Sequence, residues 1–210
     1  MIYGDIPTEI GELVNLEMMY LWSNQLTGSV PDSVGILNPV KWLWFQGSNA
    51  PRVSSYMPEE IFTFPSLSKF LDLSSNSLIG FLPSKISGLQ HLVLLNLSKN
   101  MLSGTILESF DSFISLRELY MFNNFFLGNL SPMSSMNSLE ITCISHNNIT
   151  GNQGFKNLLK TFLRNLNLSY NDLTGEVPIE GVFKNSSQVS VDGTVSFVEE
   201  FQIYSSHYAP

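Results

Sequence analysis

Few side chains in this sequence combine the residue type and the spacing that chemistry requires. Cys143 is the one cysteine, so the chain can form neither an internal disulfide nor a cysteine-based structural zinc site. The histidines His91, His146 and His207 are far apart, which disfavours a shared metal ion. We therefore predict no metal site and no cofactor, and we interpret Cys143 as an ordinary small side chain.

Acidic residues gather in one stretch without forming an identifiable acid–base pair. Glu108, Asp111 and Glu118 are close in sequence, but nothing in their spacing brings two carboxyl groups together around a substrate. We interpret them as part of a solvated outer face. The sequence also contains no Gly-rich nucleotide loop, H-R-D or D-F-G motif of a protein kinase. We predict no catalytic residues.

The composition limits the classes of partner. A chain of 210 residues that is 43% hydrophobic can build one domain with a sizeable core. Its net charge is −8, which disfavours nucleic acid, since nucleic-acid binding needs a basic patch. No segment offers about 18 consecutive apolar residues, so we predict no direct membrane insertion. The first residues also lack the basic and apolar regions of a signal peptide.

An internal repeat shows which elements must position any functional side chain. The form L-x-L-x-x-N-x-L-x-G recurs six times, with its asparagines at Asn24, Asn76, Asn100, Asn124, Asn147 and Asn171. From Asn76 onward the steps are 24, 24, 23 and 24 residues. A repeat period of this length is the signature of a solenoid.

The gap of 52 residues before Asn76 holds a degenerate unit with Ser48 at the asparagine position. We therefore predict a leading half repeat over 1–12, seven repeats over 13–191 and an atypical tail over 192–210. The segment 49–58 breaks the repeat spacing. It is either a functional loop or the result of drift in the degenerate unit.

Each repeat position has a physical role. Leu95 and Leu97 alternate with Asn96 and Ser98, as in a strand with one buried face. Asn100 then ends the strand, where its amide can donate to and accept from backbone groups. A single unit cannot bury its own apolar face, so the units must stack.

A downstream Gly-x-Ile-Pro-like element follows several units, as in 28–31, 80–83 and 175–178. With it, the 23–24-residue unit resembles the extracellular repeats of plant leucine-rich-repeat receptor-like serine/threonine kinases. Residues 57–86 and 175–185 are similar to the last ectodomain repeats of the microbe-sensing group. The resemblance implies an α/β repeat fold, a right-handed solenoid with a parallel inner β-sheet and short 3-10 or helical turns outside. It also implies a plasma-membrane immune receptor.

In that family the inner face binds a peptide or protein ligand, and the membrane-proximal repeats contact a co-receptor kinase ectodomain. The resemblance implies the same partners here. The family's signal peptide, cysteine caps, transmembrane helix and kinase domain match no segment of this sequence. We therefore expect a truncated, C-terminal part of an ectodomain that is not itself an enzyme.

The inner face offers the candidate ligand contacts. Two ladders of strand positions are expected to be exposed there, and one of them includes Ser74, Ser98, Ser145 and Ser169. Aromatic residues gather on the first two units and on the fifth: Tyr20, Trp22, Trp42, Trp44, Tyr120 and Phe122. Exposed aromatics on one face favour a partner site. Alternatively, they pack on each other and cover an end of the solenoid.

Five N-x-S/T sequons are candidate glycosylation sites, at Asn96, Asn129, Asn148, Asn167 and Asn185. They also arise by chance in a repeat rich in Asn and Ser.

Three functions stay open: a ligand-binding receptor module, a fragment of a receptor kinase, and a stand-alone intracellular scaffold or non-functional truncated product. The scaffold is disfavoured because solenoids need polar capping ends.

Overall fold

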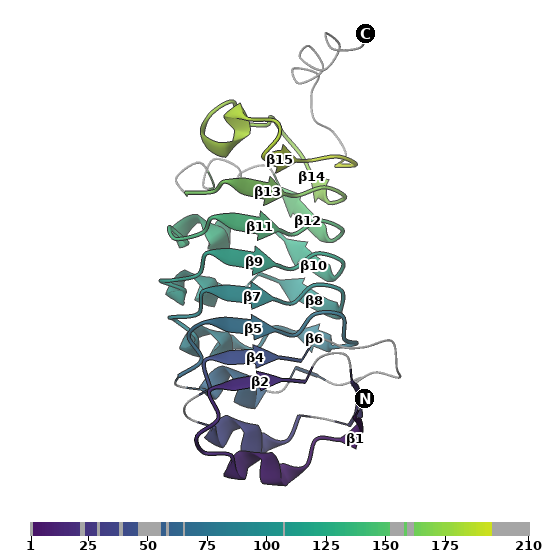
Figure 1. Cartoon of the computed structure of the whole chain (residues 1–210). Helices are drawn as coiled ribbons and strands as arrows, with labels where there is room; N and C mark the ends of the chain where they lie inside the picture. Colours follow the sequence, from purple (N-terminus) through teal and green to yellow (C-terminus); the bar gives the residue numbers. More distant parts are fainter. Residues whose placement is uncertain are drawn as a thin grey trace, which may run out of the picture.

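The computed structural model is a solenoid of stacked coils (Figure 1). It describes residues 2–21, 24–28, 30–37, 40–45, 56–57, 59–64, 66–106, 108–151, 158 and 162–194. Several predicted features lie outside these residues. They are Trp22, Ser48, His207, positions 49–55 and 58 of the irregular loop, and the tail from residue 195.

One parallel sheet runs along the inner face, with one strand from each coil. Its strands are in chain order: β2 (Met18–Tyr20), β4 (Trp42–Trp44), β5 (Phe70–Asp72), β7 (Leu94–Asn96), β9 (Glu118–Tyr120), β11 (Ile141–Cys143), β13 (Asn165–Asn167) and β15 (Val189–Ser190). The first seven are the strands of the seven predicted repeats. The short β15 pairs with β13 and extends the sheet by one strand that the repeat count did not include.

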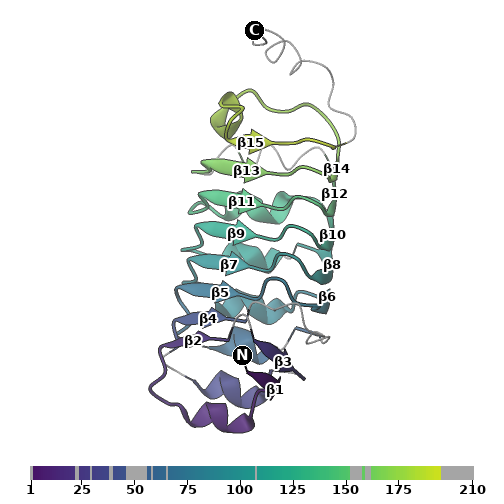
Figure 2. The ribbon, with the colours of Figure 1, turned by 45° about the vertical axis from the view of Figure 1, so that its right-hand side comes forward.

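A second parallel sheet follows the asparagine turns and was not predicted. It contains β6 (Ile79–Phe81), β8 (Met101–Thr105), β10 (Phe125–Gly128), β12 (Asn148–Gly151) and β14 (Asp172–Leu173). A separate pair, β1 (Tyr3–Asp5) and β3 (Gln25–Thr27), lies at the N-terminal end. Figure 2 shows the second sheet as a column beside the inner strands. We call this second sheet the flank sheet.

Short 3-10 turns return the chain to the next inner strand. They are η1 (Thr8–Glu12), η2 (Asp32–Ile36), η3 (Glu59–Thr63), η4 (Ser84–Gly88), η5 (Glu108–Ser112), η6 (Ser131–Ser135) and η7 (Gly181–Lys184). Pro31 and Pro83 directly precede η2 and η4 at φ of −72° and −71°, the value that the proline ring fixes. The predicted fold class, a solenoid with a parallel inner sheet and 3-10 turns, is confirmed.

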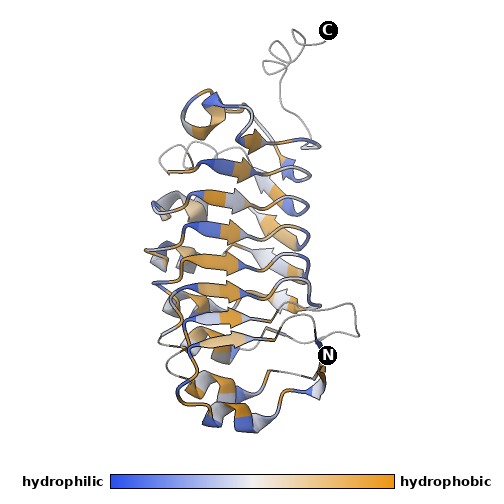
Figure 3. Ribbon diagram, in the orientation of Figure 1, coloured by the Kyte–Doolittle hydropathy of each residue, from blue (hydrophilic) through white to orange (hydrophobic). Residues whose placement is uncertain are grey.

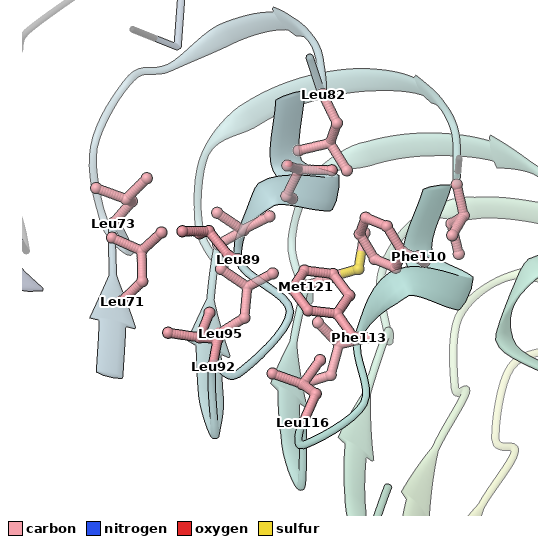
Figure 4. Close-up of a cluster of buried hydrophobic side chains, with 14 of the residues drawn as sticks. Leu71, Leu73, Leu82, Leu89, Leu92, Leu95, Phe110, Phe113, Leu116 and Met121 are labelled. Carbon is pink, nitrogen blue, oxygen red and sulfur yellow. The ribbon is translucent and has the colours of Figure 1, made fainter. Parts of the chain in front are cut away.

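The core fills the space between the two sheets and the 3-10 turns. The central residue of each three-residue inner strand is buried, as in Leu71, Leu95 and Leu119. Figure 4 shows leucines of successive coils packed against one another, and Figure 3 shows apolar residues along the inner strands from coil to coil. Phe110 and Phe113 meet edge to face with ring centroids 5.3 Å apart. Each coil is therefore stabilised by its two neighbours.

The repeated asparagines join neighbouring coils. The Nδ2 atom of Asn124 donates to the carbonyls of Leu97 and Met121 over 2.9 and 3.1 Å, and its Oδ1 accepts from the N–H of Leu102 over 3.0 Å. Asn76, Asn100, Asn147 and Asn171 likewise each donate to the carbonyl of their own strand end and to that of the previous coil. The side chain of Asn24 donates to Leu21 and accepts from the N–H of Ile2.

The four inner-face serines Ser74, Ser98, Ser145 and Ser169 are buried. The prediction that these side chains are exposed on the inner face was therefore wrong. Ser98 donates through Oγ to the Oδ1 atom of Asn96 over 2.7 Å, and the Ser98 N–H donates to the same oxygen. Asp72 accepts similarly from the N–H of Ser74. In both pairs the side chain two positions earlier on the strand bonds to the serine residue, and the serine is buried.

Candidate ligand-binding face

Strand register arranges the inner-face side chains in columns that cross the strands. The first residues of the strands align as Met18, Trp42, Phe70, Leu94, Glu118, Ile141 and Asn165. The third residues align as Tyr20, Trp44, Asp72, Asn96, Tyr120, Cys143 and Asn167. Adjacent strands lie about 4.8 Å apart, so neighbours in a column are in contact range.

Four rings form one continuous cluster, which we call the aromatic block: Tyr20, Trp42, Trp44 and Phe70. Trp42 stacks on Phe70 with centroids 4.3 Å apart and planes at 11°, and Trp44 lies 5.5 Å from Phe70 at 16°. Tyr20 lies 5.0 Å from Trp44. The rings pack on each other and remain partly open to solvent, and Tyr20 is 48% exposed. The rings therefore pack on one another, as the second interpretation predicted, and the partner site stays a prediction.

Phe70 belongs to the block but was not among the predicted contacts. It occupies the strand position of Trp42 in the next coil, since Trp42 pairs with Phe70 in the sheet register. The intervening segment of irregular length obscured this equivalence in the sequence. Trp22, a predicted member, lies outside the described residues.

Tyr120 and Phe122 are separated from the aromatic block by the column members Asp72 and Asn96. Tyr120 donates its hydroxyl to Glu118 over 2.9 Å, and burial, followed by this acceptor, raises the pKa of Tyr120 to about 12. Lys99 places its Nζ 5.8 Å from the centroid of the Phe122 ring, within cation–π range. Tyr120 and Phe122 thus each contact a charged side chain, Glu118 and Lys99 respectively.

Polar groups dominate the C-terminal half of the face. The change begins at β5 and β7, where the Nδ2 atom of Asn96 donates to Asp72 over 3.1 Å. A pocket of about 670 Å³ opens over the last three inner strands, and its lining includes Cys143, Asn167 and Asp192. The inner face therefore changes from aromatic at β2–β5 to hydrogen-bonding at β11–β15.

Charged residues just before the strands border the face. Lys41 pairs with Glu17 across β4 and β2 over 3.0 Å. Glu140 lies between Arg117 and Arg164, at 3.5 and 3.8 Å. These pairs are largely exposed, so each contributes at most about 1 kcal/mol to folding.

The sequons divide between two surfaces. Asn96 and Asn167 lie on the inner face and are half-buried, whereas Asn129, Asn148 and Asn185 are exposed.

No group of three or more His, Cys, Asp or Glu in the described part of the chain could hold a metal ion. Among the same residues, no helix is both long and apolar enough to cross a bilayer.

Comparison with known proteins decides how this geometry is classified. The leucine rich repeat family model matches residues 15–37, 69–89, 91–113 and 162–181. The chain is a leucine-rich-repeat solenoid. These comparisons identify leucine-rich repeats along it and no catalytic domain.

Curated relatives of this leucine-rich-repeat chain are plant receptor-like proteins. Receptor-like protein EIX1 of Solanum lycopersicum is 33% identical over 145 residues, which are 68% of this chain and 14% of the relative. Receptor-like protein 35 of Arabidopsis thaliana is 33% identical over 148 residues, 70% of this chain and 15% of the relative. The chain thus spans about a seventh of the length of these curated relatives.

Solved structures of plant receptor ectodomains have the same fold as this chain. The PEPR1–AtPEP1 complex superposes with a TM-score of 0.82 at 26% identity, covering 92% of this chain and 27% of that one. The Arabidopsis receptor kinase HAESA, solved with the peptide hormone IDA and the co-receptor SERK1, gives a TM-score of 0.77 at 32% identity, covering 84% and 29%. The leucine-rich-repeat chain is therefore similar to a segment of a plant receptor ectodomain.

Proposed function

We propose that this chain is a ligand-binding segment of a plant cell-surface receptor ectodomain and that it binds an extended peptide segment along its inner face. The aromatic block carries the proposal. Trp42, Trp44 and Phe70 present a partly exposed stacked surface on a rigid sheet, and rigid aromatic anchors dominate binding energies at interfaces.

The dimensions of the face suit a short peptide. Seven strand-to-strand steps of about 4.8 Å make about 34 Å, which an extended peptide of about ten residues spans. Apolar or aromatic ligand side chains would lie over the aromatic block. The ligand backbone would meet the amides of Asn165 and Asn167, which offer both donors and acceptors.

The comparisons support a peptide ligand because HAESA was solved with the peptide hormone IDA. A co-receptor is proposed as a second partner on the same basis, since the HAESA complex also contains SERK1. The resemblance of residues 57–86 and 175–185 to the microbe-sensing receptor kinases extends the proposal to defence signalling at the plasma membrane. In that setting the kinase activity would reside in a part of the receptor other than this repeat segment.

A peptide-display selection tests the proposal. Random peptides of about ten residues are selected on the immobilised chain. Enriched peptides should carry aromatic or aliphatic anchors, and Trp44→Ser should abolish their binding. Phe125→Ser, on the flank sheet, is the matched control and should leave binding unchanged, with circular dichroism verifying the fold of both variants. Selected peptides that bind Trp44→Ser as well as the parent chain would refute this site.

A further inference from the structure

The five sequons have identical chemistry in the sequence, but the fold gives them different surroundings. Asn129, Asn148 and Asn185 are exposed outside the inner face, and Asn96 and Asn167 are half-buried on it. An N-linked glycan needs space outside the protein for a branched, hydrated group bonded to Nδ2. The surroundings of each Nδ2 therefore decide where a glycan fits on the folded chain.

The outer asparagines hold their side chains in conformations that leave Nδ2 open. Asn129 accepts through Oδ1 from the N–H of Ser131 over 2.8 Å, and Asn185 accepts through Oδ1 from the N–H of Ser187 over 3.1 Å. Asn148 begins β12 with its side chain exposed. In the described part of the chain, none of these three Nδ2 atoms donates a hydrogen bond.

The inner asparagines lie between close neighbours. Asn96 uses both amide atoms, since Nδ2 donates to Asp72 and Oδ1 accepts from Ser98. Asn167 lines the C-terminal pocket, and the hydroxyl of its sequon residue Ser169 is 2.7 Å from the hydroxyl of Ser190. A sugar on either Nδ2 would stand in a column whose members are about 4.8 Å apart.

The flank sheet gives a second reason to place glycans outside. It exposes Phe81, Phe125 and Leu127 by 72%, 62% and 43%, an apolar surface that a monomeric protein normally keeps small. Asn148 pairs directly with Leu127 in the sheet register, and Asn129 follows β10 two residues after Leu127. Glycans on these two asparagines would lie beside the exposed apolar side chains and shield them.

We propose that Asn129, Asn148 and Asn185 carry N-linked glycans, that Asn96 and Asn167 stay unmodified, and that the two flank glycans shield the apolar flank sheet. The proposal rests on the proposed extracellular location.

The co-reactant that supplies the glycan is a lipid-linked pyrophosphate oligosaccharide. Transfer forms a bond between Nδ2 and C1 of the first sugar and breaks the bond from C1 to the pyrophosphate oxygen. The lipid pyrophosphate leaves with the amide proton.

Site mapping tests the pattern. The full chain is secreted from plant cells behind an added leader, deglycosylated enzymatically in heavy-oxygen water, and digested for mass spectrometry. Asn129, Asn148 and Asn185 should appear as labelled aspartate, and Asn96 and Asn167 should remain asparagine. A label at Asn96 or Asn167, or its absence from any outer site, would overturn the proposal. No ligand takes part, so this outcome is independent of peptide binding.

Single substitutions give a second readout that does not require digestion. Each of Asn129→Gln, Asn148→Gln and Asn185→Gln should increase gel mobility by one glycan, and Asn96→Gln should leave mobility unchanged. The double variant Asn129→Gln/Asn148→Gln should bind more of an apolar dye than the matched single variant Asn185→Gln. Equal dye binding would refute the shielding role.

Discussion

The side-chain amide of Asn124 donates to the backbone carbonyl of Leu97, which belongs to the preceding coil, over 2.9 Å. The same nitrogen donates to Met121 at the end of its own strand, while Oδ1 accepts from Leu102. One buried side chain thus bonds to backbone groups of its own coil and of the preceding coil. Recurrence of this arrangement from coil to coil couples each repeat to its neighbour.

Asn124→Ala should therefore destabilise the fold by about 1–3 kcal/mol, because it leaves buried backbone groups without partners. Chemical denaturation measures the loss. Asn137→Ala is the matched control, since Asn137 is exposed, and its effect should stay within about 0.5 kcal/mol. Equal stability of the two variants would contradict the coupling role of Asn124.

Gly104 should not tolerate a side chain. Its φ is +82°, and a methyl group there would overlap the ring of Phe81 in the preceding coil. Gly104→Ala should cost more than about 1 kcal/mol of unfolding free energy. Gly4→Ala is a useful comparison, because Gly4 has φ of +93° with no atom near the added methyl group.

The two contributions at Gly104 can be separated. Combining Gly104→Ala with Phe81→Ala removes the steric overlap and leaves only the unfavourable φ, so the double variant should lose less stability than the two single changes add up to. Simple additivity in thermal or chemical unfolding would show that Phe81 does not press on Gly104.

The stacking of Trp42 on Phe70 should be measurable as a coupling energy. A double-mutant cycle with Trp42→Ala and Phe70→Ala should give about 0.5–1.5 kcal/mol. The cycle of Trp42→Ala with Phe122→Ala is the control, since β4 and β9 are three strand steps, about 14 Å, apart and should be additive within about 0.5 kcal/mol. A coupling no larger than in the control would mean that the rings do not form one block.

Tyr120 should lose its proton well above the ordinary tyrosine range. Burial and the Glu118 acceptor raise the pKa of Tyr120 to about 12, so the folded state holds its proton more tightly than the unfolded state. Its contribution to stability is complete below about pH 10 and is lost as the pH rises toward 12. Absorbance at alkaline pH should show a late-titrating phenol signal that is lost in Tyr120→Phe. A difference spectrum centred near pH 10 would contradict this.

Much of the fold follows from the sequence. The period from Asn76 to Asn171 predicted the stacked coils, and the alternation around Leu95 predicted the inner strands with their buried leucines. These features are local, because the spacing of apolar residues and the hydrogen-bonding capacity of an asparagine depend little on distant parts of the chain. Repetition then multiplies a weak local signal into a specific one.

The flank sheet required the tertiary structure. Its strands follow the asparagine turns in segments that carry no clear alternation, and they pair only because stacking brings equivalent segments of successive coils within hydrogen-bond distance. The same stacking exposed Phe125 and Leu127 and buried Ser98. Solvent exposure of a side chain depends on neighbours from other coils, which local sequence does not specify.

The candidate site divides in the same way. Residue type and repeat position identified Trp42, Trp44 and Tyr20 as inner-face aromatics, because strand alternation alone assigns a side chain to a face. Only the sheet register added Phe70 to the block and separated Tyr120 from it. Likewise, the sequence determined where the five sequons lie, and packing decided which asparagines have room around Nδ2. Contacts between side chains in different coils depend on register, and register is a property of the assembled solenoid.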